Sequence, residues 1–218
     1  LLLMAKLMQK YLLMFDIHKT ALTGSTGKTS TKELLTAILE DNAPTLKTLK
    51  NENNIIGLCK TILRIEPNHR FDVFEIGTNH FGEIARLSDI IMPDAGIILN
   101  VGPSHLEYFG DEDGVMREKT DLFHRALDLR LYPADDPRFE IYHESGKSVG
   151  YAEDAAYQIS DVREEAQRKS FVLCGIRYTI QYSAPHYVIN GAFAIAMALN
   201  LGIEPREIQI ALHKPVAL

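Results

Sequence analysis

The sequence predicts an α/β fold: a mostly parallel sheet flanked by helices, with a small antiparallel excursion. Amphipathic helical stretches alternate with short apolar runs over roughly the first 130 residues, which is typical of parallel strands joined by crossover helices. Residues 95–102 ("AGIILNVG") are almost continuously apolar, as expected of a strand buried on both faces. With 218 residues, 46% of them hydrophobic, the chain is long enough to bury one full α/β core.

Composition argues against several classes of protein. A net charge of -6 disfavours a nucleic-acid partner, because such surfaces need clustered Lys and Arg. The two cysteines, Cys59 and Cys174, are too few for a disulfide framework, so we expect a cytoplasmic protein. Lys6 and Lys10 interrupt the apolar opening stretch, and we therefore expect neither membrane insertion nor a signal peptide.

The opening stretch is predicted to be a helix with a wide apolar face. Apolar residues recur at helical spacing, at Leu3, Leu7, Met8, Tyr11 and Met14. Further apolar residues widen this face beyond one contact surface: Leu1, Leu2, Leu12 and Leu13. We expect that another part of the full protein covers the surplus.

The predicted core units follow in order. A strand at residues 19–23 enters a glycine-rich loop, and residues 29–39 form a helix with a stripe of Leu and Ile. Residues 54–65 form a second helix and residues 71–77 ("FDVFEIG") a strand. A helix at residues 83–91 should stop before Pro93, since proline cannot continue it.

The second half changes character. We expect a helix at residues 115–127 and the end of a strand at residues 134–136. Residues 157–182 alternate between apolar and polar positions, which predicts the antiparallel excursion. Residues 188–201 form a helix of small residues that Gly202 ends.

The stretch "TGSTGKTS" (residues 23–30) is predicted to bind a phosphate chain. The first glycine of the generic G-x-x-x-x-G-K-[ST] pattern is replaced by Leu22, but Gly27, Lys28 and Thr29 remain. Backbone N–H groups at a helix start would hold the anion, Lys28 would reach the terminal phosphates, and Thr29 would contact Mg²⁺. The predicted nucleotide-binding residues are Gly24, Ser25, Thr26, Gly27, Lys28, Thr29 and Ser30. The alternative is a flexible turn before a helix.

These motifs resemble the Mur ligase family, ATP-dependent amide-forming enzymes of peptidoglycan synthesis related to folylpolyglutamate synthases. "TGSTGKTSTKE" resembles the family's T-G-[ST]-x-G-K-[ST] loop, and "NENNIIG" (residues 51–57) its N-x-N-N-x-x-G segment. "FEIGTNHFGEI" (residues 74–84) and "NVGPSHLEYFG" (residues 100–110) resemble two further motifs. The resemblance implies the family's P-loop NTPase-like central domain. Within the family, the motifs most closely resemble those of the branch that joins D-alanyl-D-alanine to UDP-N-acetylmuramoyl-tripeptide.

Three residues are candidates for Mg²⁺ binding besides Thr29. Glu75 ends a predicted buried strand, where a carboxylate faces the loop and can hold the ion; a carboxylate paired with a structural lysine is the alternative. The resemblance implies that His105 binds a second Mg²⁺ and that Lys119 is carbamylated, which would convert an ammonium into a metal ligand. Without the family resemblance, we would interpret His105 as an ordinary loop histidine. Arg117, Glu118 and Lys119 would be interpreted as a solvated helix face.

The resemblance also implies contacts with adenine and substrate. "PHYVINGAFAIA" (residues 185–196) resembles the adenine-site helix and offers His186 and Asn190, although Tyr187 and Ala184 depart from the family pattern. Asn53 and Asn54 are candidate substrate-binding residues.

Asn79 and His80 are candidate catalytic residues beside Lys28 and Lys119. Asn-rich turns also serve as simple backbone caps. His186 as an ordinary packed histidine is a further alternative.

The implied reaction is ATP-dependent ligation through an acyl phosphate, with ATP and two Mg²⁺ ions. Its implied partners are UDP-N-acetylmuramoyl peptide and D-alanyl-D-alanine, for a protein that is monomeric at full length. Another Mur ligase or folylpolyglutamate-type acceptor remains open. Rivals from other classes are a P-loop regulatory ATPase and a non-catalytic nucleotide-binding remnant.

The expected organisation is a linker helix at residues 1–18 from a missing N-terminal domain and a central ATP-binding domain at residues 19–218, with the C-terminal ligase domain absent. We expect residues 1–218 alone to bind ATP weakly and not to complete the reaction.

Overall fold

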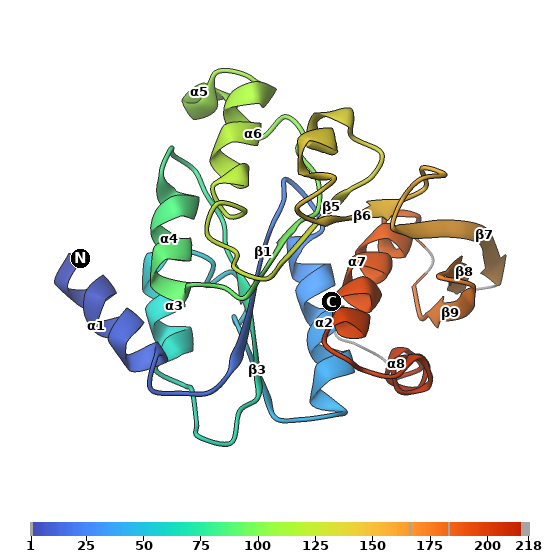
Figure 1. Cartoon of the computed structure of the whole chain (residues 1–218), viewed down its shortest axis with the longest axis horizontal. Helices are drawn as coiled ribbons and strands as arrows, with labels where there is room; N and C mark the ends of the chain where they lie inside the picture. The colour runs from blue at the N-terminus through green and yellow to red at the C-terminus, as the bar shows by residue number, and fades with distance from the viewer. Residues whose placement is uncertain (1, 166, 183, 215–218) are drawn as a thin grey trace.

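One nine-stranded sheet forms the centre of the computed structural model, which describes residues 2–165, 167–182 and 184–214 (Figure 1). Its described strands are β1 (His18–Thr23), β2 (Thr45–Lys47), β3 (Phe71–Glu75), β4 (Ala95–Ile98), β5 (Leu129–Pro133), β6 (Lys147–Gly150), β7 (Tyr157–Glu165), β8 (Arg168–Leu173) and β9 (Ile176–Ile180). They lie in the order β2-β3-β1-β4-β5-β6-β7-β8-β9. The described helices are α1 (Leu2–Leu12), α2 (Lys28–Glu40), α3 (Ile55–Ile62), α4 (Glu83–Ile91), α5 (Leu106–Phe109), α6 (Glu112–Thr120), the 3₁₀ helix η1 (Pro137–Tyr142), α7 (His186–Asn200) and α8 (Pro205–Leu212).

Parallel pairing runs from β2 through β7, and β7, β8 and β9 pair antiparallel. Leu22 of β1 lies beside Glu75 of β3 and Ile97 of β4. The carboxyl ends of these three strands therefore reach the same edge of the sheet. The predicted parallel sheet with an antiparallel excursion is confirmed.

Helices cover both faces of the sheet (Figure 1). One core forms between the strands and α2, α7 and α8; it includes the buried Leu34, Ile38 and Phe193. The other forms on the opposite face with α1, α3, α4 and α6; it includes Leu58 and Phe123. The apolar stripe predicted for α2 is the buried one, because a 3.6-residue period places those side chains on one face.

Helix α6 differs most from its prediction. It begins at Glu112 because the side chain of Asp111 accepts a hydrogen bond from the Gly114 N–H and so caps the helix. It ends at Thr120, and residues 121–125 form turns instead of the predicted helix to residue 127. The apolar residues of that segment are nevertheless buried, so the periodicity reported burial and not helical backbone.

Several short elements were not predicted: β2, β6, α5, η1 and α8. Strands of three or four residues carry too little alternation to be distinguished from loops. Helix α8 did carry a signal, since Pro205 occupies its first turn and Glu204 and Glu207 form a capping box.

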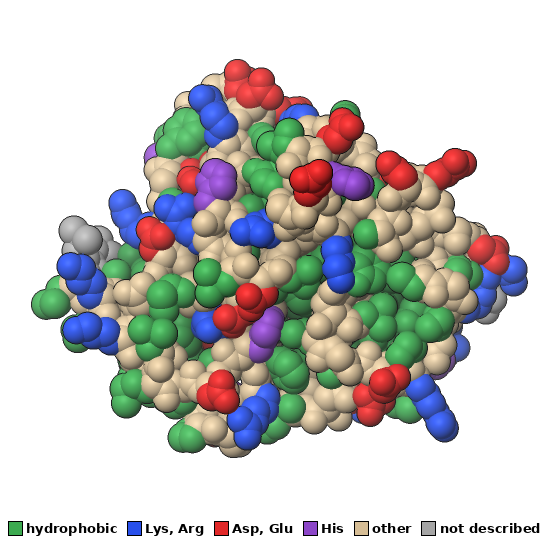
Figure 2. Space-filling view, viewed as in Figure 1, with side chains coloured by type: hydrophobic (Ala, Val, Ile, Leu, Met, Phe, Trp, Pro, Cys, Tyr) green, Lys and Arg blue, Asp and Glu red, His purple; other side chains and the backbone are tan. Residues whose placement is uncertain are grey.

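Part of α1 packs against the domain, and part of it is exposed. Leu12 is buried, whereas Leu7 is 53% exposed, and Leu13 and Met14, which follow the helix, are 64% and 76% exposed. Figure 2 shows hydrophobic side chains on the surface at the end of the molecule where α1 lies, and charges of both signs interspersed over this face. Among the described residues, no helix combines the length and the apolar run that crossing a membrane requires.

Asp72 of β3 is a buried carboxyl group that is not among the site residues predicted from the sequence. Its side chain is fully buried, and neither oxygen has a hydrogen-bond partner among the described residues. Burial raises the pKa of Asp72 well above its usual value, although Arg64 and Lys19 oppose the shift. The unfolded chain ionises this group at its ordinary pKa, so Asp72 lowers stability progressively as the pH rises from that value towards the raised pKa.

We predict that Asp72→Asn removes this pH-dependent loss. The free energy of unfolding of the variant should exceed that of the wild type by about 1 to 3 kcal/mol at neutral pH and match it near pH ~4. Urea unfolding at both pH values checks this. A difference between the two proteins that does not change with pH would contradict the assignment.

Candidate active site

A phosphate-binding loop begins where β1 ends. Gly27 lies just before α2 with a φ of 80°, in the left-handed region that favours glycine. A Cβ atom at this position would also lie 2.5 Å from Asn190 Oδ1. Gly27 therefore allows both the turn of the loop and its close packing on α7. The start of α2 presents backbone N–H groups to an anion.

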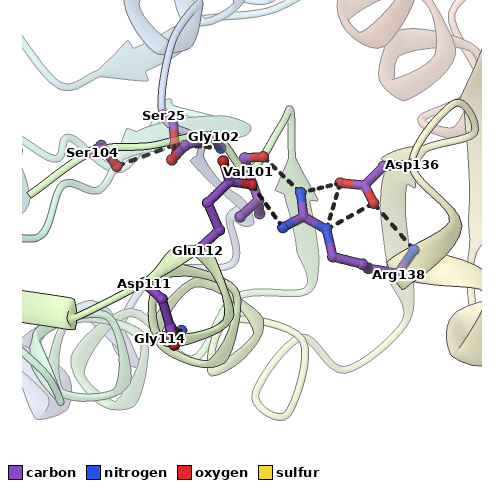
Figure 3. A network of polar contacts seen from close by, with 9 residues as sticks. All are labelled: Ser25, Val101, Gly102, Ser104, Asp111, Glu112, Gly114, Asp136 and Arg138. Atoms are coloured by element: carbon purple, nitrogen blue, oxygen red, sulfur yellow. Dashed lines mark hydrogen bonds and ion pairs between the residues drawn. The ribbon is translucent and has the colours of Figure 1, made fainter. Parts of the chain in front are cut away.

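This loop is braced by the segment that follows β4. Thr26 N donates to Asn100 Oδ1 at 3.0 Å, and Asn100 Nδ2 donates back to Thr26 O at 3.1 Å. The Ser25 hydroxyl accepts from Gly102 N at 3.0 Å and lies 3.2 Å from the Ser104 hydroxyl (Figure 3). These contacts join two segments more than 70 residues apart in the sequence. They hold the phosphate-binding loop beside the segment that carries His105.

Arg138 anchors the same segment from its other side. Its guanidinium donates to Val101 O at 2.8 Å and to Asp136 Oδ2 at 2.7 Å, and also reaches Glu112 Oε2 at 3.1 Å (Figure 3). Through these bonds η1 and α6 fix the backbone of residues 101–102. The sequence showed no signal for this contact, because it depends on the tertiary placement of η1.

Lys28, Thr29 and Glu75 meet at the carboxyl edge of the sheet. The Thr29 hydroxyl donates to Glu75 Oε2 at 3.1 Å, and Lys28 Nζ donates to Gly24 O at 2.7 Å. Burial lowers the pKa of Lys28, and the nearby Glu75 carboxylate partly offsets this.

Glu75 has structural partners as well. Its Oε2 lies 3.3 Å from Nζ of Lys32, a fully buried lysine, and its Oε1 accepts from Asn53 Nδ2 at 3.1 Å. The structural lysine that the sequence analysis considered as an alternative partner of Glu75 is therefore present. Lys32 itself was missed. It lies one helical turn after Thr29 on α2, and this spacing is the feature of the sequence that could have identified it as a neighbour of the site.

Lys119 is buried beside the same site. It is 3% exposed, so the alternative of a solvated helix face is wrong for this residue. Burial and, to a lesser extent, the nearby Lys28 ammonium lower the pKa of Lys119 to about 8, while Glu118 opposes the shift. A lysine with this pKa presents an unprotonated amine at mildly alkaline pH.

A cavity of about 220 Å³ opens beside the phosphate-binding loop. It is lined by Lys28, Asn53, Asn54, Ile55, Gly77, Thr78, Asn79, Glu83, Arg86, Leu87 and His105. Candidates from four separate sequence motifs thus share one cavity wall. Within it, Asn54 Oδ1 also caps α3 by accepting from Ile56 N and Gly57 N.

The remaining candidates lie outside this lining. His80 contacts the Tyr108 ring, with centroids 4.4 Å apart, and its side chain is 59% exposed. His186 is exposed at the start of α7, with its ring 4.4 Å from that of Tyr187. Asn190 is buried behind Gly27, and its Nδ2 has no hydrogen-bond partner among the described residues.

Glu118 has a positioning role that sequence reasoning missed. It is 1% exposed and accepts hydrogen bonds from Gly82 N at 2.6 Å and Ile84 N at 2.8 Å, while the Thr78 hydroxyl lies 3.0 Å away. A carboxylate at the start of α4 satisfies N–H groups that the helix itself leaves unpaired. Glu118 thereby fixes the cavity wall to the helix that carries Lys119.

The oxygen ligands fit a hard divalent cation. The Thr29 hydroxyl and Glu75 carboxylate lie together at the loop, and hydroxyl, carboxylate and phosphate oxygens are the ligands that Mg²⁺ prefers. No group of three His, Cys, Asp or Glu side chains in the described part of the chain is arranged to hold a metal ion by itself. A bound nucleotide would have to supply further ligands, as is usual for Mg²⁺ in phosphoryl-transfer sites.

Comparison with known proteins gives concordant results. Residues 22–198 match the family model described as the Mur ligase middle domain. The chain is 32% identical over 207 residues to the UDP-N-acetylmuramoyl-tripeptide--D-alanyl-D-alanine ligase of Haemophilus influenzae, a match covering 89% of this chain and 45% of that protein. The chain therefore spans less than half the length of this curated relative.

Solved structures agree. A crystal structure of MurF from Acinetobacter baumannii superposes with a TM-score of 0.92 at 31% identity, covering 100% of this chain and 50% of that one. MurF ligase from Thermotoga maritima in complex with ADP superposes with a TM-score of 0.88 at 25% identity, covering 99% and 52%.

We predict that Glu118→Ala lowers the free energy of unfolding by about 2 to 4 kcal/mol, because the buried N–H of Ile84 and the N–H of Gly82 lose a charged acceptor. Urea unfolding measures this, and amide hydrogen exchange at Gly82 and Ile84 should accelerate. The control is Glu112→Ala on the same helix, whose half-exposed ion pair with Arg138 should contribute at most about 1 kcal/mol. Equal losses in the two variants would refute the special role of Glu118.

Proposed function

The chain belongs to the Mur ligase family, and from this premise we propose that it is the ATP-binding part of an enzyme that joins D-alanyl-D-alanine to UDP-N-acetylmuramoyl-tripeptide. One observation carries the proposal: Lys28 belongs to the phosphate-binding loop and also lines the adjoining cavity. A phosphoryl donor in the loop and a carboxylate in the cavity would meet at this side chain.

The proposed reaction has two steps. A carboxylate oxygen of the peptidyl substrate attacks the γ-phosphorus of ATP, the bond from that phosphorus to the bridging oxygen breaks, and ADP leaves. The acyl phosphate is then attacked at its carbonyl carbon by the amine of D-alanyl-D-alanine. The tetrahedral intermediate expels inorganic phosphate, the amine loses a proton, and an amide bond remains.

The residues of this chain act by placement and charge. Backbone N–H groups at the start of α2 would hold the phosphates, and the Lys28 ammonium would neutralise charge that develops on the transferred group. Asn53, Asn54 and Asn79 offer amide groups that orient the peptidyl substrate in the cavity, with His80 at its edge. No nucleophilic side chain is required.

Thr29 and Glu75 would hold a Mg²⁺ ion, which when bound neutralises the nucleotide phosphates. His105 and a carbamylated Lys119 would hold a second, as the family resemblance implies. His186 and Asn190 are proposed to lie near adenine; Asn190 Nδ2, which has no partner in the described part of the chain, supports a polar ligand on that side of Gly27.

We also propose that residues 1–18 link this domain to a preceding one, which fits the exposed apolar residues of α1. The full protein would be a cytoplasmic monomer with a further C-terminal domain. The curated relative is named as a ligase of UDP-N-acetylmuramoyl-tripeptide and D-alanyl-D-alanine, and the chain spans about half of the length of its relatives.

Phosphate release by the natural protein that contains this chain tests the function. We predict that release from ATP requires both UDP-N-acetylmuramoyl-tripeptide and D-alanyl-D-alanine, with the L,L dipeptide as the matched control. Lys28→Ala should reduce the rate at least ~100-fold. Release that needs neither substrate would favour a regulatory ATPase, and nucleotide binding without any phosphate release would favour a non-catalytic remnant.

Lys119 provides a separate prediction. Carbamate forms when an unprotonated amine attacks CO₂, and the lowered pKa of Lys119 makes that form available well below the range of an ordinary lysine. With ¹³C-bicarbonate, a carbamate signal should increase between about pH 7 and about pH 9, and Lys119→Arg should abolish it. Lys60→Arg, at an exposed lysine, is the control and should change nothing. A signal that persists in Lys119→Arg would exclude Lys119 as its source.

A further inference from the structure

Arg86 is a charged residue of the cavity wall whose side chain has no partner among the residues that the structure describes. It belongs to α4 and lines the same cavity as Lys28 and Asn79. It forms no hydrogen bond or ion pair through its side chain with any residue that the structure describes, and it is exposed. By contrast, Arg138 is paired with Asp136, and Arg125 with Asp89.

The acidic neighbour that would normally pair with Arg86 is engaged elsewhere. Glu83 lies three residues earlier on α4, at a spacing that allows an ion pair. Its Oε2 instead accepts from Asn79 N at 2.6 Å and His80 N at 3.1 Å. The carboxylate thus closes the turn before α4, and the guanidinium charge of Arg86 is left for a ligand.

The other groups in the cavity favour an anion. Among the residues that line it, Lys28 and His105 carry no negative charge. Asn53, Asn54 and Asn79 contribute amide groups that can donate hydrogen bonds. Glu83 is the acidic residue among the described lining residues, and its charge is already shared with two N–H groups. A guanidinium is planar and offers paired donors that match a carboxylate.

We propose that Arg86 binds a carboxylate of the peptidyl substrate other than the carboxylate that is activated. This inference rests on the proposed function. The activated carboxylate must lie next to the γ-phosphate, and therefore near Lys28, in the first step. A second carboxylate of the same substrate is then held by Arg86 elsewhere along the cavity, so that Arg86 sets the position of the reacting group and selects an acidic peptide.

The test uses the natural full-length protein with Arg86→Gln and Arg86→Lys. For Arg86→Gln, the KM for UDP-N-acetylmuramoyl-tripeptide should rise about 10- to 100-fold, while the KM values for ATP and D-alanyl-D-alanine change less than about twofold. Arg86→Lys should recover part of the loss, since it keeps the charge without the planar fork. The control is Arg206→Gln, an exposed arginine on α8 that does not line the cavity.

A modified substrate makes the test specific. Amidation of the non-reacting carboxyl groups of the peptidyl substrate should weaken its use by the wild type about 10- to 100-fold and leave Arg86→Gln nearly indifferent. Equal sensitivity of both proteins to amidation would overturn the proposal, as would a rise in KM for D-alanyl-D-alanine instead. If the wild type does not turn over the unmodified substrate, the proposed function fails and this inference fails with it; turnover without an Arg86 effect removes the inference alone.

Discussion

The site depends on the parallel pairing of β1 with both β3 and β4. Because the three strands run in the same direction, their carboxyl ends reach one edge, and the segments that follow them must lie side by side. Glu75 is the last residue of β3, and its carboxylate meets Thr29 from the loop after β1. The crossed hydrogen bonds between Thr26 and Asn100 then fix the loop after β1 to the segment after β4.

Around this edge the protein buries more charge than packing alone would favour. Lys32, Glu75, Glu118 and Lys119 are almost fully removed from solvent. Burying a charge is unfavourable unless it is paired or hydrogen-bonded, and Glu75 and Glu118 satisfy that requirement with Lys32 and with backbone N–H groups. For Lys119, burial and the nearby Lys28 ammonium outweigh the attraction of Glu118, and its pKa falls. Such a concentration of buried ionisable groups is expected at a functional site.

Sequence reasoning succeeded where one local rule governs a segment. The stripe on α2, the limits of α4 and the ending of α7 near Gly202 follow from periodicity, proline and glycine, and the structure confirms them. It was wrong about residues 121–127, where Leu122, Phe123 and Ala126 are buried on a backbone that is not helical, because apolar spacing reports burial whatever the backbone conformation. Glu118 was missed for a related reason: a charged residue on a predicted helix is normally exposed, and only its distant N–H partners explain its burial.

By itself the sequence determined the class of fold, the order of its main strands and helices, and the phosphate-binding loop, since these depend on neighbouring residues and on spacings of two to four. Only the tertiary structure decided which side chains share the cavity. It brought Arg86 into the cavity that Lys28 also lines, placed Asn190 against Gly27 and set Arg138 on the backbone of Val101. These contacts join positions tens of residues apart, and they arise from strand order and helix packing, which local periodicity does not encode.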